Sequence, residues 1–242
     1  MQKNCIELKN CSLYNDDSAI LQNISWKIKE NENWALIGPN GSGKTTLLKI
    51  ISGYMWPTSG EIMILGEELG KTDIRELRKK IGWVTTYLLE KIPANEKVID
   101  VAISGKHASF GVYEKITAKD IKKAESLLEF LDAAYLKERR FNLTSQGEKQ
   151  KILIARALMA DPILLILDEP CTSLDMKARK TLLSSVSKIC NSRKTNVIYV
   201  THHFDEIVPE IKNVMMIKKG KMFKIGLKDK LLSNDNLDKL FN

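Results

Sequence analysis

The sequence predicts an α/β fold built on a mainly parallel sheet, and three observations support this prediction. Strand-like and helix-like segments alternate along the 242 residues. The short runs 34–37, 163–167 and 196–200 are almost entirely apolar, as is typical of strands buried on both faces of a parallel sheet. Apolar residues between 120 and 136 recur with a helical period. Parallel strands with connecting helices are therefore expected.

The N-terminal part has a different pattern. Polar and apolar residues alternate over Cys5–Leu8 and again over Ile24–Ile28. This alternation is typical of half-buried antiparallel strands. A turn at 57–60 precedes another strand candidate at 61–65. We therefore expect an N-terminal antiparallel β-subdomain.

The middle of the chain predicts a helical insertion. One helix is expected over 120–136 and a second over 147–159, after an irregular stretch that contains Gly105, Gly111 and Tyr113. We interpret 86–160 as an inserted helical subdomain. Residues 1–85 and 161–242 then form the α/β core of a single domain.

The last part of the core predicts three further elements. A helix is expected from near Asp175, and a hairpin over 214–225 is followed by a short amphipathic helix.

Composition limits the classes of protein. The chain carries 38 Lys and Arg against 30 Asp and Glu, a net charge of +8, with 43% hydrophobic residues. These values exclude a largely disordered chain. The longest aliphatic run, 163–167, is far shorter than the about 20 residues of a membrane-spanning helix, and the first five residues lack an apolar signal-peptide core. A cytoplasmic protein is expected, peripheral on the inner face of the membrane if it acts there.

The cysteine content and the net charge add little to the prediction of a cytoplasmic protein. Four cysteines without zinc-site spacing, at 5, 11, 171 and 190, predict reduced thiols. The positive charge is compatible with nucleic acid, an anionic membrane, an anionic ligand or solubility alone.

A phosphate-binding loop is the clearest motif. Every specified position of G-x-x-x-x-G-K-[ST] is present in Gly38-Pro39-Asn40-Gly41-Ser42-Gly43-Lys44-Thr45. Glycines let backbone N–H groups point at phosphates, and the helix that follows favours an anion. Lys44 would reach the β- and γ-phosphates and Thr45 would ligate Mg²⁺. Thr46 stands where a dinucleotide fingerprint needs glycine, so we expect a nucleoside triphosphate, with Thr46 in its binding set.

Two acids follow the second apolar run. Asp168 and Glu169 stand at the end of a predicted parallel strand, beside which ligands bind. Asp168 is expected to hold Mg²⁺ and Glu169 to accept a proton from attacking water. A purely structural role as helix caps is the alternative. With the phosphate loop present, ATP hydrolysis is predicted on a P-loop NTPase core.

With these motifs the sequence resembles the ATP-binding-cassette (ABC) ATPases over nearly its whole length. Residues 144–151, Thr-Ser-Gln-Gly-Glu-Lys-Gln-Lys, resemble the family signature L-S-G-G-Q. Ser145 and Gly147 match, whereas Glu148 replaces Gln. The resemblance implies that this helix end faces the γ-phosphate held by a second subunit, so that a homodimer or heterodimer encloses two ATP molecules.

The resemblance implies further roles. Residues 171–175 resemble the loop that crosses the dimer interface. His202 takes the place of the switch histidine that contacts the γ-phosphate, and Tyr14 that of the aromatic residue that stacks on adenine. Thr86 replaces a glutamine that touches Mg²⁺ and couples to transmembrane partners. This replacement and the altered signature resemble a branch of stand-alone bacterial cassettes akin to the molybdate-associated ATPase ModF.

Two functions follow from the resemblance. The first is the ATP-binding subunit of an ABC transporter with separate transmembrane permease subunits. The alternative is a soluble ABC ATPase that acts on nucleic acid, the ribosome or a regulatory partner. A third reading, an interaction module that binds ATP with negligible hydrolysis, is disfavoured by the two acids at 168 and 169. The lysines between 218 and 230 have a single aromatic residue among them, Phe223, rather than the interleaved aromatics of a base-stacking surface, and they predict a solvated face.

Overall fold

The computed structural model describes residues 3–16, 18–107, 116–192 and 194–241. The strands are β1 (Asn4–Asn15), β2 (Ser18–Lys29), β3 (Trp34–Ile37), β4 (Ser59–Ile64), β5 (Glu67–Glu68), β6 (Ile81–Val84), β7 (Leu164–Asp168), β8 (Asn196–Thr201), β9 (Asn213–Lys218) and β10 (Lys221–Leu227). The α-helices are α1 (Lys44–Ile51), α2 (Ile74–Lys79), α3 (Val98–Ser104), α4 (Ala118–Phe130), α5 (Gln146–Leu158), α6 (Met176–Ser192), α7 (Lys228–Leu231) and α8 (Asn234–Phe241). Short 3-10 turns are η1 (Thr86–Glu90), η2 (Gly105–His107), η3 (Ala134–Leu136), η4 (Phe141–Leu143) and η5 (Phe204–Glu206).

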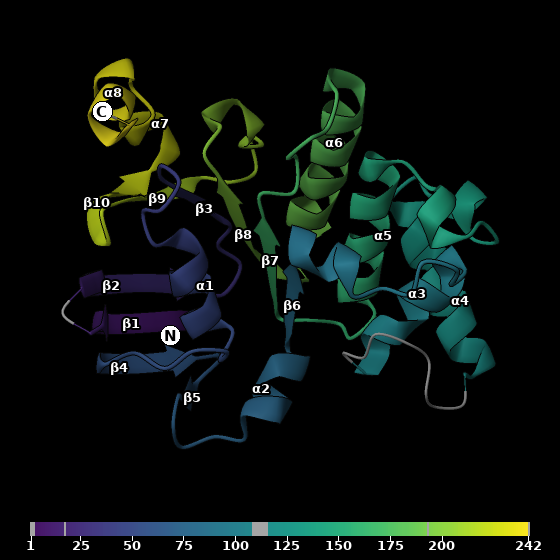
Figure 1. The fold of residues 1–242 in the computed structure, drawn as a ribbon, viewed down its shortest axis with the longest axis horizontal. Coiled ribbons are helices and arrows are strands. Elements are labelled where there is room, and N and C mark those ends of the chain that lie inside the picture. Colours follow the sequence, from purple (N-terminus) through teal and green to yellow (C-terminus); the bar gives the residue numbers. More distant parts are fainter. Residues whose placement is uncertain (1–2, 17, 108–115, 193, 242) are drawn as a thin grey trace.

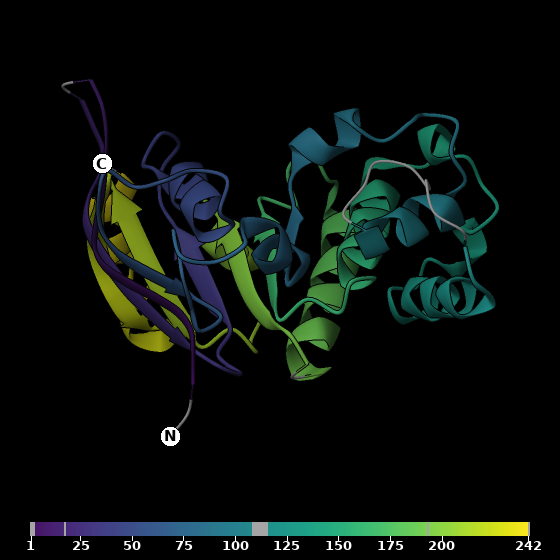
Figure 2. The same cartoon turned by 90° about the horizontal axis from the view of Figure 1, so that it is seen from below.

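Two sheets form the framework. The larger has the order β10-β9-β3-β8-β7-β6, and the pairs β9·β3, β3·β8, β8·β7 and β7·β6 are parallel. The smaller has the order β2-β1-β4-β5 and is antiparallel. Figure 1 shows the smaller sheet on the left and α3, α4 and α5 on the right; Figure 2 shows the same separation from below. The predicted fold class is confirmed.

Two apolar clusters hold the layers together. Successive side chains of a strand point to opposite faces, so the central strands contribute to both clusters. Leu36 and Ile166 pack with α1 and the smaller sheet on one face. Ala35 and Leu165 pack with α3 to α6 on the other face. The short apolar runs are thus buried on both faces, as their composition predicted.

Some elements differ from the sequence expectation. The helix expected over 120–136 ends at Phe130, because Asp132 adopts a left-handed backbone (φ 53°) and a turn follows. Helices α2 and α3 were not predicted: α2 has six residues with one buried, and α3 begins with a valine-rich run that resembles a strand. The predicted irregular residues Gly111 and Tyr113 lie outside the described residues. None of the described helices is long and apolar enough to cross a membrane.

Candidate active site

The phosphate loop connects β3 to α1, and its backbone needs glycine. Gly41 and Gly43 have positive φ angles of 74° and 104°. At Gly38 a Cβ atom would lie 2.2 Å from the carbonyl oxygen of Ile217. Helix α1 begins at Lys44 without a side-chain hydrogen bond at its N-cap and without an acidic residue in its first turn. Its first N–H groups are therefore oriented to bind an anion.

Lys44 is held inside this loop. Its side chain is 6% exposed, and its Nζ donates to the carbonyl oxygens of Gly38 at 2.8 Å and Pro39 at 3.1 Å. The same Nζ lies 3.5 Å from Oε1 of Glu169. Ser42 Oγ is buried without a hydrogen-bond partner in the described part of the chain. The loop thus holds a buried cation and an unpaired hydroxyl, which fits a phosphate-bearing ligand.

The two acids lie at the carboxyl end of β7. Asp168 pairs with Val200 of β8, and burial, reinforced by the neighbouring Glu169 charge, raises the pKa of Asp168 to about 6, although Lys44 opposes the shift. A buried carboxylate with a raised pKa is suited to binding a cation. Glu169 has a left-handed backbone (φ 50°), and its N–H donates to the carbonyl oxygen of Val200 at 2.9 Å.

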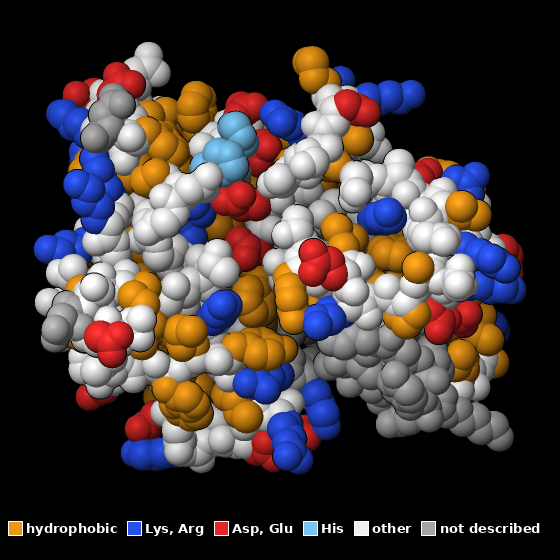
Figure 3. Space-filling model, in the orientation of Figure 1, with side chains coloured by type: hydrophobic (Ala, Val, Ile, Leu, Met, Phe, Trp, Pro, Cys, Tyr) orange, Lys and Arg blue, Asp and Glu red, His pale blue; other side chains and the backbone are white. Residues whose placement is uncertain are grey.

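His202 follows β8 and completes the cluster. Its Nδ1 lies 3.3 Å from Oε1 of Glu169, and its ring lies 4.1 Å, centre to centre, from that of His203. Figure 3 shows histidine side chains on this face next to acidic ones. Lys44, Glu169 and His202, which lie far apart in sequence, therefore meet at one sheet edge.

The signature residues form the N-terminus of α5, and no hydrogen bond or ion pair among the described residues joins them to the phosphate loop. Ser145 is the N-cap: its Oγ accepts from the Glu148 N–H at 3.3 Å, and Glu148 Oε2 accepts from the Ser145 N–H at 2.7 Å. The Tyr135 hydroxyl donates to Glu148 Oε1 at 2.8 Å. Burial opposes ionisation of Glu148, but these hydrogen bonds lower its pKa on balance.

Close packing explains the glycine of the signature. A Cβ at Gly147 would lie 2.9 Å from Cβ of Ala178, so this glycine lets α5 approach α6 closely. The residue therefore has a structural reason to be glycine besides any contact with a ligand.

Tyr14 and Thr86 lie on exposed parts of the fold. Tyr14 is 48% exposed, pairs with Ala19 of β2, and donates its N–H to Thr58 Oγ1 at 3.1 Å. The next residues of β2 reach the phosphate loop: Leu21 Cδ2 would lie 2.7 Å from a Cβ placed at Gly43. Thr86 is the exposed first residue of η1, after β6. Both therefore stand near the edge that carries the site.

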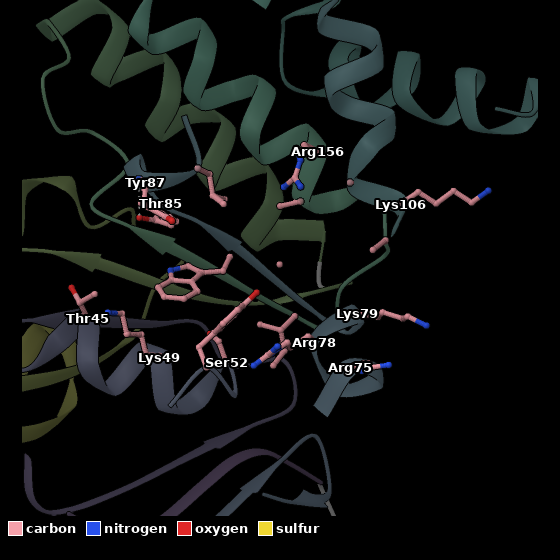
Figure 4. A pocket seen from close by; sticks show the side chains of 18 residues that line it. Thr45, Lys49, Ser52, Arg75, Arg78, Lys79, Thr85, Tyr87, Lys106 and Arg156 are labelled. Atoms are coloured by element: carbon pink, nitrogen blue, oxygen red, sulfur yellow. Dashed lines mark hydrogen bonds between the residues drawn. The ribbon is translucent and has the colours of Figure 1, made fainter. Parts of the chain in front are cut away.

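A groove beside the site was missed by the sequence analysis. Its volume is about 830 Å³, and Figure 4 shows its basic side chains coming from α1, α2, η2 and α5. Its basic residues are Lys49, Arg75, Arg78, Lys79, Lys106 and Arg156, and none of the described residues that line it is acidic. No local pattern predicts this groove, because the residues that line it are spread from 45 to 160.

Aromatic and unpaired polar groups line the same groove. The Tyr54 and Trp83 rings lie 5.6 Å apart, and the Arg78 guanidinium lies 4.1 Å from the centre of the Tyr54 ring. Ser52 Oγ is buried without a hydrogen-bond partner in the described residues. A ligand of this groove would therefore meet positive charge and aromatic surface.

Fold and site together define a phosphate-loop ATPase of the α/β class, and comparison with known proteins identifies its family. Residues 21–172 match the ABC transporter family. The chain is 45% identical to the ABC transporter ATP-binding protein YlmA of Bacillus subtilis (strain 168), over 98% of this chain and 90% of that protein. The chain belongs to the ABC transporter ATP-binding family, whose cassettes are ATPases.

Two further similarities extend the comparison. The chain is 32% identical to the phosphonates import ATP-binding protein PhnC of Treponema denticola, over 93% of this chain and 91% of that protein. The cassette MJ0796, solved as a dimer in a post-hydrolysis state with ADP and Pi, is 26% identical; the match covers 92% of this chain and 98% of that chain, with a TM-score of 0.77. The predicted family, fold and ATPase activity are confirmed. The ModF-like branch stays a prediction.

Proposed function

We propose that the chain hydrolyses ATP at the Glu169–His202 pair and that this hydrolysis is coupled to separate membrane-spanning subunits. One observation carries the proposal: Oε1 of Glu169 lies 3.3 Å from Nδ1 of His202 and 3.5 Å from Nζ of Lys44. In this arrangement the Glu169 carboxylate accepts the proton of the attacking water. His202 orients that water and the γ-phosphate, and Lys44 binds the phosphates.

The residues around this pair form the nucleotide site in the proposal. Phosphates bind to the backbone of the phosphate loop and to Thr46, and adenine stacks on Tyr14. The positive φ angles of Gly41 and Gly43 support this assignment, since they let N–H groups face one anion. The core formed by 1–85 and 161–242 supplies these residues, and the helical subdomain, 86–160, supplies the signature.

The donor set also fits Mg²⁺. Thr45, Asp168 and Thr86 would hold the ion, which prefers oxygen ligands. The buried Asp168 carboxylate supports this assignment. Burial raises its pKa to about 6, so the neighbouring groups compensate its negative charge only in part. When bound, Mg²⁺ neutralises phosphate charge during hydrolysis.

A second cassette completes the site in this proposal. Ser145, Gly147 and Glu148 of one copy then face the nucleotide held by the phosphate loop of the other. The dimeric structure of the similar cassette MJ0796 supports this arrangement. So does the end of α5, which presents the exposed Ser145 rather than burying it in its own chain.

The basic groove is the proposed docking surface for the membrane subunit. A cytoplasmic segment with acidic residues would complement Lys49 and Arg75, and its apolar side chains would pack on Tyr54 and Trp83. Peripheral attachment to the inner face of the membrane follows from docking. The import protein PhnC among the relatives supports transport as the purpose.

Purified chain and its Glu169→Gln variant test the proposed reaction. The substitution removes the base but keeps the shape of the side chain, so we expect ATP binding to persist and hydrolysis to fall by about 100-fold or more. A variant that hydrolyses ATP at the unchanged rate would show that Glu169 is not the base.

Affinity purification from membranes tests the proposed partner. We expect a membrane protein to co-purify with the chain, and Lys49→Glu together with Arg75→Glu to release it while ATPase activity persists. Salt-sensitive binding to nucleic acid or ribosomes without a membrane partner would support the alternative function instead.

A further inference from the structure

A buried carboxylate outside the proposed catalytic set lies close to the switch histidine. Glu206, in η5, follows His202 by four residues, and its side chain is 3% exposed. Burial of a carboxylate is unfavourable unless hydrogen bonds and a positive charge compensate for it. The fold supplies both the hydrogen bonds and the positive charge. The groups that supply them contact the segments that carry His202 and Glu169.

One set of contacts leads to His202. Thr201, the last residue of β8, is 1% exposed, and its Oγ1 donates to Glu206 Oε2 at 2.7 Å. The same Oγ1 accepts from the backbone N–H of His203 at 2.9 Å. Glu206 thus holds a hydroxyl that fixes the backbone on both sides of His202.

A second set leads to the loop of Glu169. The Tyr199 hydroxyl lies 3.3 Å from Glu206 Oε2 and 3.3 Å from Sγ of Cys171, two residues after Glu169. Burial raises the pKa of Cys171 to about 11 and that of Tyr199 well above its usual value. Both groups are therefore neutral at pH 7. The neutral Tyr199 hydroxyl donates a hydrogen bond to the Glu206 carboxylate, and its contact with Cys171 Sγ ties the loop of Glu169 to β8.

A cation completes the cluster. Nε of Arg179 lies 3.6 Å from Oε1 of Glu206, and Nη1 of Arg179 lies 3.7 Å from Asp205. Arg179 belongs to α6, which starts directly after the loop that follows Glu169, and Figure 1 shows α6 beside β7 and β8. One carboxylate therefore joins the backbone before α6, α6 itself and the segment of His202.

We propose that Glu206 is a positioning residue for ATP hydrolysis. Through Thr201 and Tyr199 it fixes His202 and Glu169 relative to each other, at the observed 3.3 Å. The inference rests on the roles proposed above for these two residues. A carboxylate suits this task because one oxygen accepts from two hydroxyls while the other faces a guanidinium. A glutamine would place an NH₂ group against one of these partners.

Steady-state ATP hydrolysis by Glu206→Gln and Thr201→Val tests the proposal. Rates are expressed per nucleotide-binding site, counted by titration, so that misfolded protein does not contribute. We expect kcat to fall by about tenfold and KM for ATP to change by less than about twofold, because positioning affects the reaction more than ground-state binding. Thr201→Ser, which keeps the hydroxyl, is expected to recover most of the rate.

Glu210→Gln is the matched control. Glu210 lies on the same segment, and its Oε1 accepts from Ser187 at 2.7 Å and Asn191 at 3.1 Å rather than from residues of the site. The proposal is wrong if Glu206→Gln and Thr201→Val keep the kcat of this control, or if Thr201→Ser is as slow as Thr201→Val. Should Glu206→Gln not fold, the Thr201 pair decides alone.

Glu169→Gln, measured in parallel, separates this inference from the proposed function. Inactive Glu169→Gln with unaffected Glu206→Gln would reject the positioning role only. Full activity of Glu169→Gln would reject the assigned base itself.

Discussion

Helices α1 and α5 begin at the two functional loops, yet their N-termini are built in opposite ways. Gly43 caps α1 with a left-handed backbone, no side-chain hydrogen bond and no acid in the first turn. Ser145 caps α5 within a complete capping box, and the Glu148 carboxylate already accepts a backbone N–H. A helix N-terminus attracts negative charge through its free N–H groups and its dipole. The N-terminus of α1 therefore keeps its N–H groups for a ligand, whereas that of α5 is already capped by side chains of the same chain.

This difference indicates that the two loops contribute differently to phosphate binding. In our proposal the phosphate loop is already shaped for an anion, since Gly41 and Gly43 have the positive φ angles that the loop needs. At α5, an incoming phosphate meets the Glu148 carboxylate, whose charge opposes it. In our proposal the phosphate loop therefore supplies affinity, and the end of α5 supplies a weaker contact that depends on a second copy.

The largest expected effect comes from removing the conformational freedom of α1's cap. At Gly43, φ is 104° and an added Cβ would lie 2.7 Å from Leu21 Cδ2, so Gly43→Ala both strains and displaces the loop. We expect ATP affinity, measured by calorimetry, to fall by about 100-fold. Gly66→Ala is the control, because Gly66 also has positive φ (81°) but nothing within 4 Å. Equal ATP affinity of the two variants would contradict the prediction.

A smaller effect concerns the acid that faces α1. In the folded chain the pKa of Asp168 is about 6, above its usual 3.8, so the folded state binds the proton more tightly and loses stability as pH rises from about 4 to 6. Asp168→Asn should therefore raise the free energy of unfolding at pH 7.5 by on the order of 1–2 kcal/mol, and by less at pH 5. Urea unfolding in EDTA without nucleotide measures this. A gain that is larger at pH 5 would refute it.

The smallest effect is expected at α5. Glu148→Gln keeps an oxygen acceptor for the Ser145 N–H but removes the negative charge, so the helix end should accept a phosphate more readily. In the hydrolysis-deficient Glu169→Gln background, we expect ATP-driven dimerisation to tighten by about threefold, measured by sedimentation. Tyr135→Phe, which removes only the hydrogen bond to Glu148, is the control. Weaker dimerisation of Glu148→Gln would mean that its carboxylate assists assembly.

The same contrast explains what the sequence could predict. Residues 38–45 were recognisable because a phosphate cradle is local: glycines, lysine and threonine must occupy fixed offsets. Asp168 and Glu169 were predictable from an apolar strand that ends in acids. The helix expected over 147–159 was found from its period and is observed from Gln146, while its role and that of His202 came from the family resemblance.

The rest depends on contacts between distant segments. The groove joins Tyr54, Arg78, Trp83 and Arg156 from segments far apart in the sequence, so no single motif predicts it. The cluster at Glu206 requires β8, η5 and α6 to pack together, which no local pattern records. Helix α2 buries one residue only, so its sequence has no readable period.

The left-handed backbone of Glu169 has a consequence for how the protein balances durability against turnover. A φ of 50° at a residue with a side chain is conformational energy held at the position where the reaction is proposed to occur. Glycine would relax that backbone and abolish the base in the same change. Selection for a more stable fold and selection for an active enzyme therefore oppose each other at this single residue.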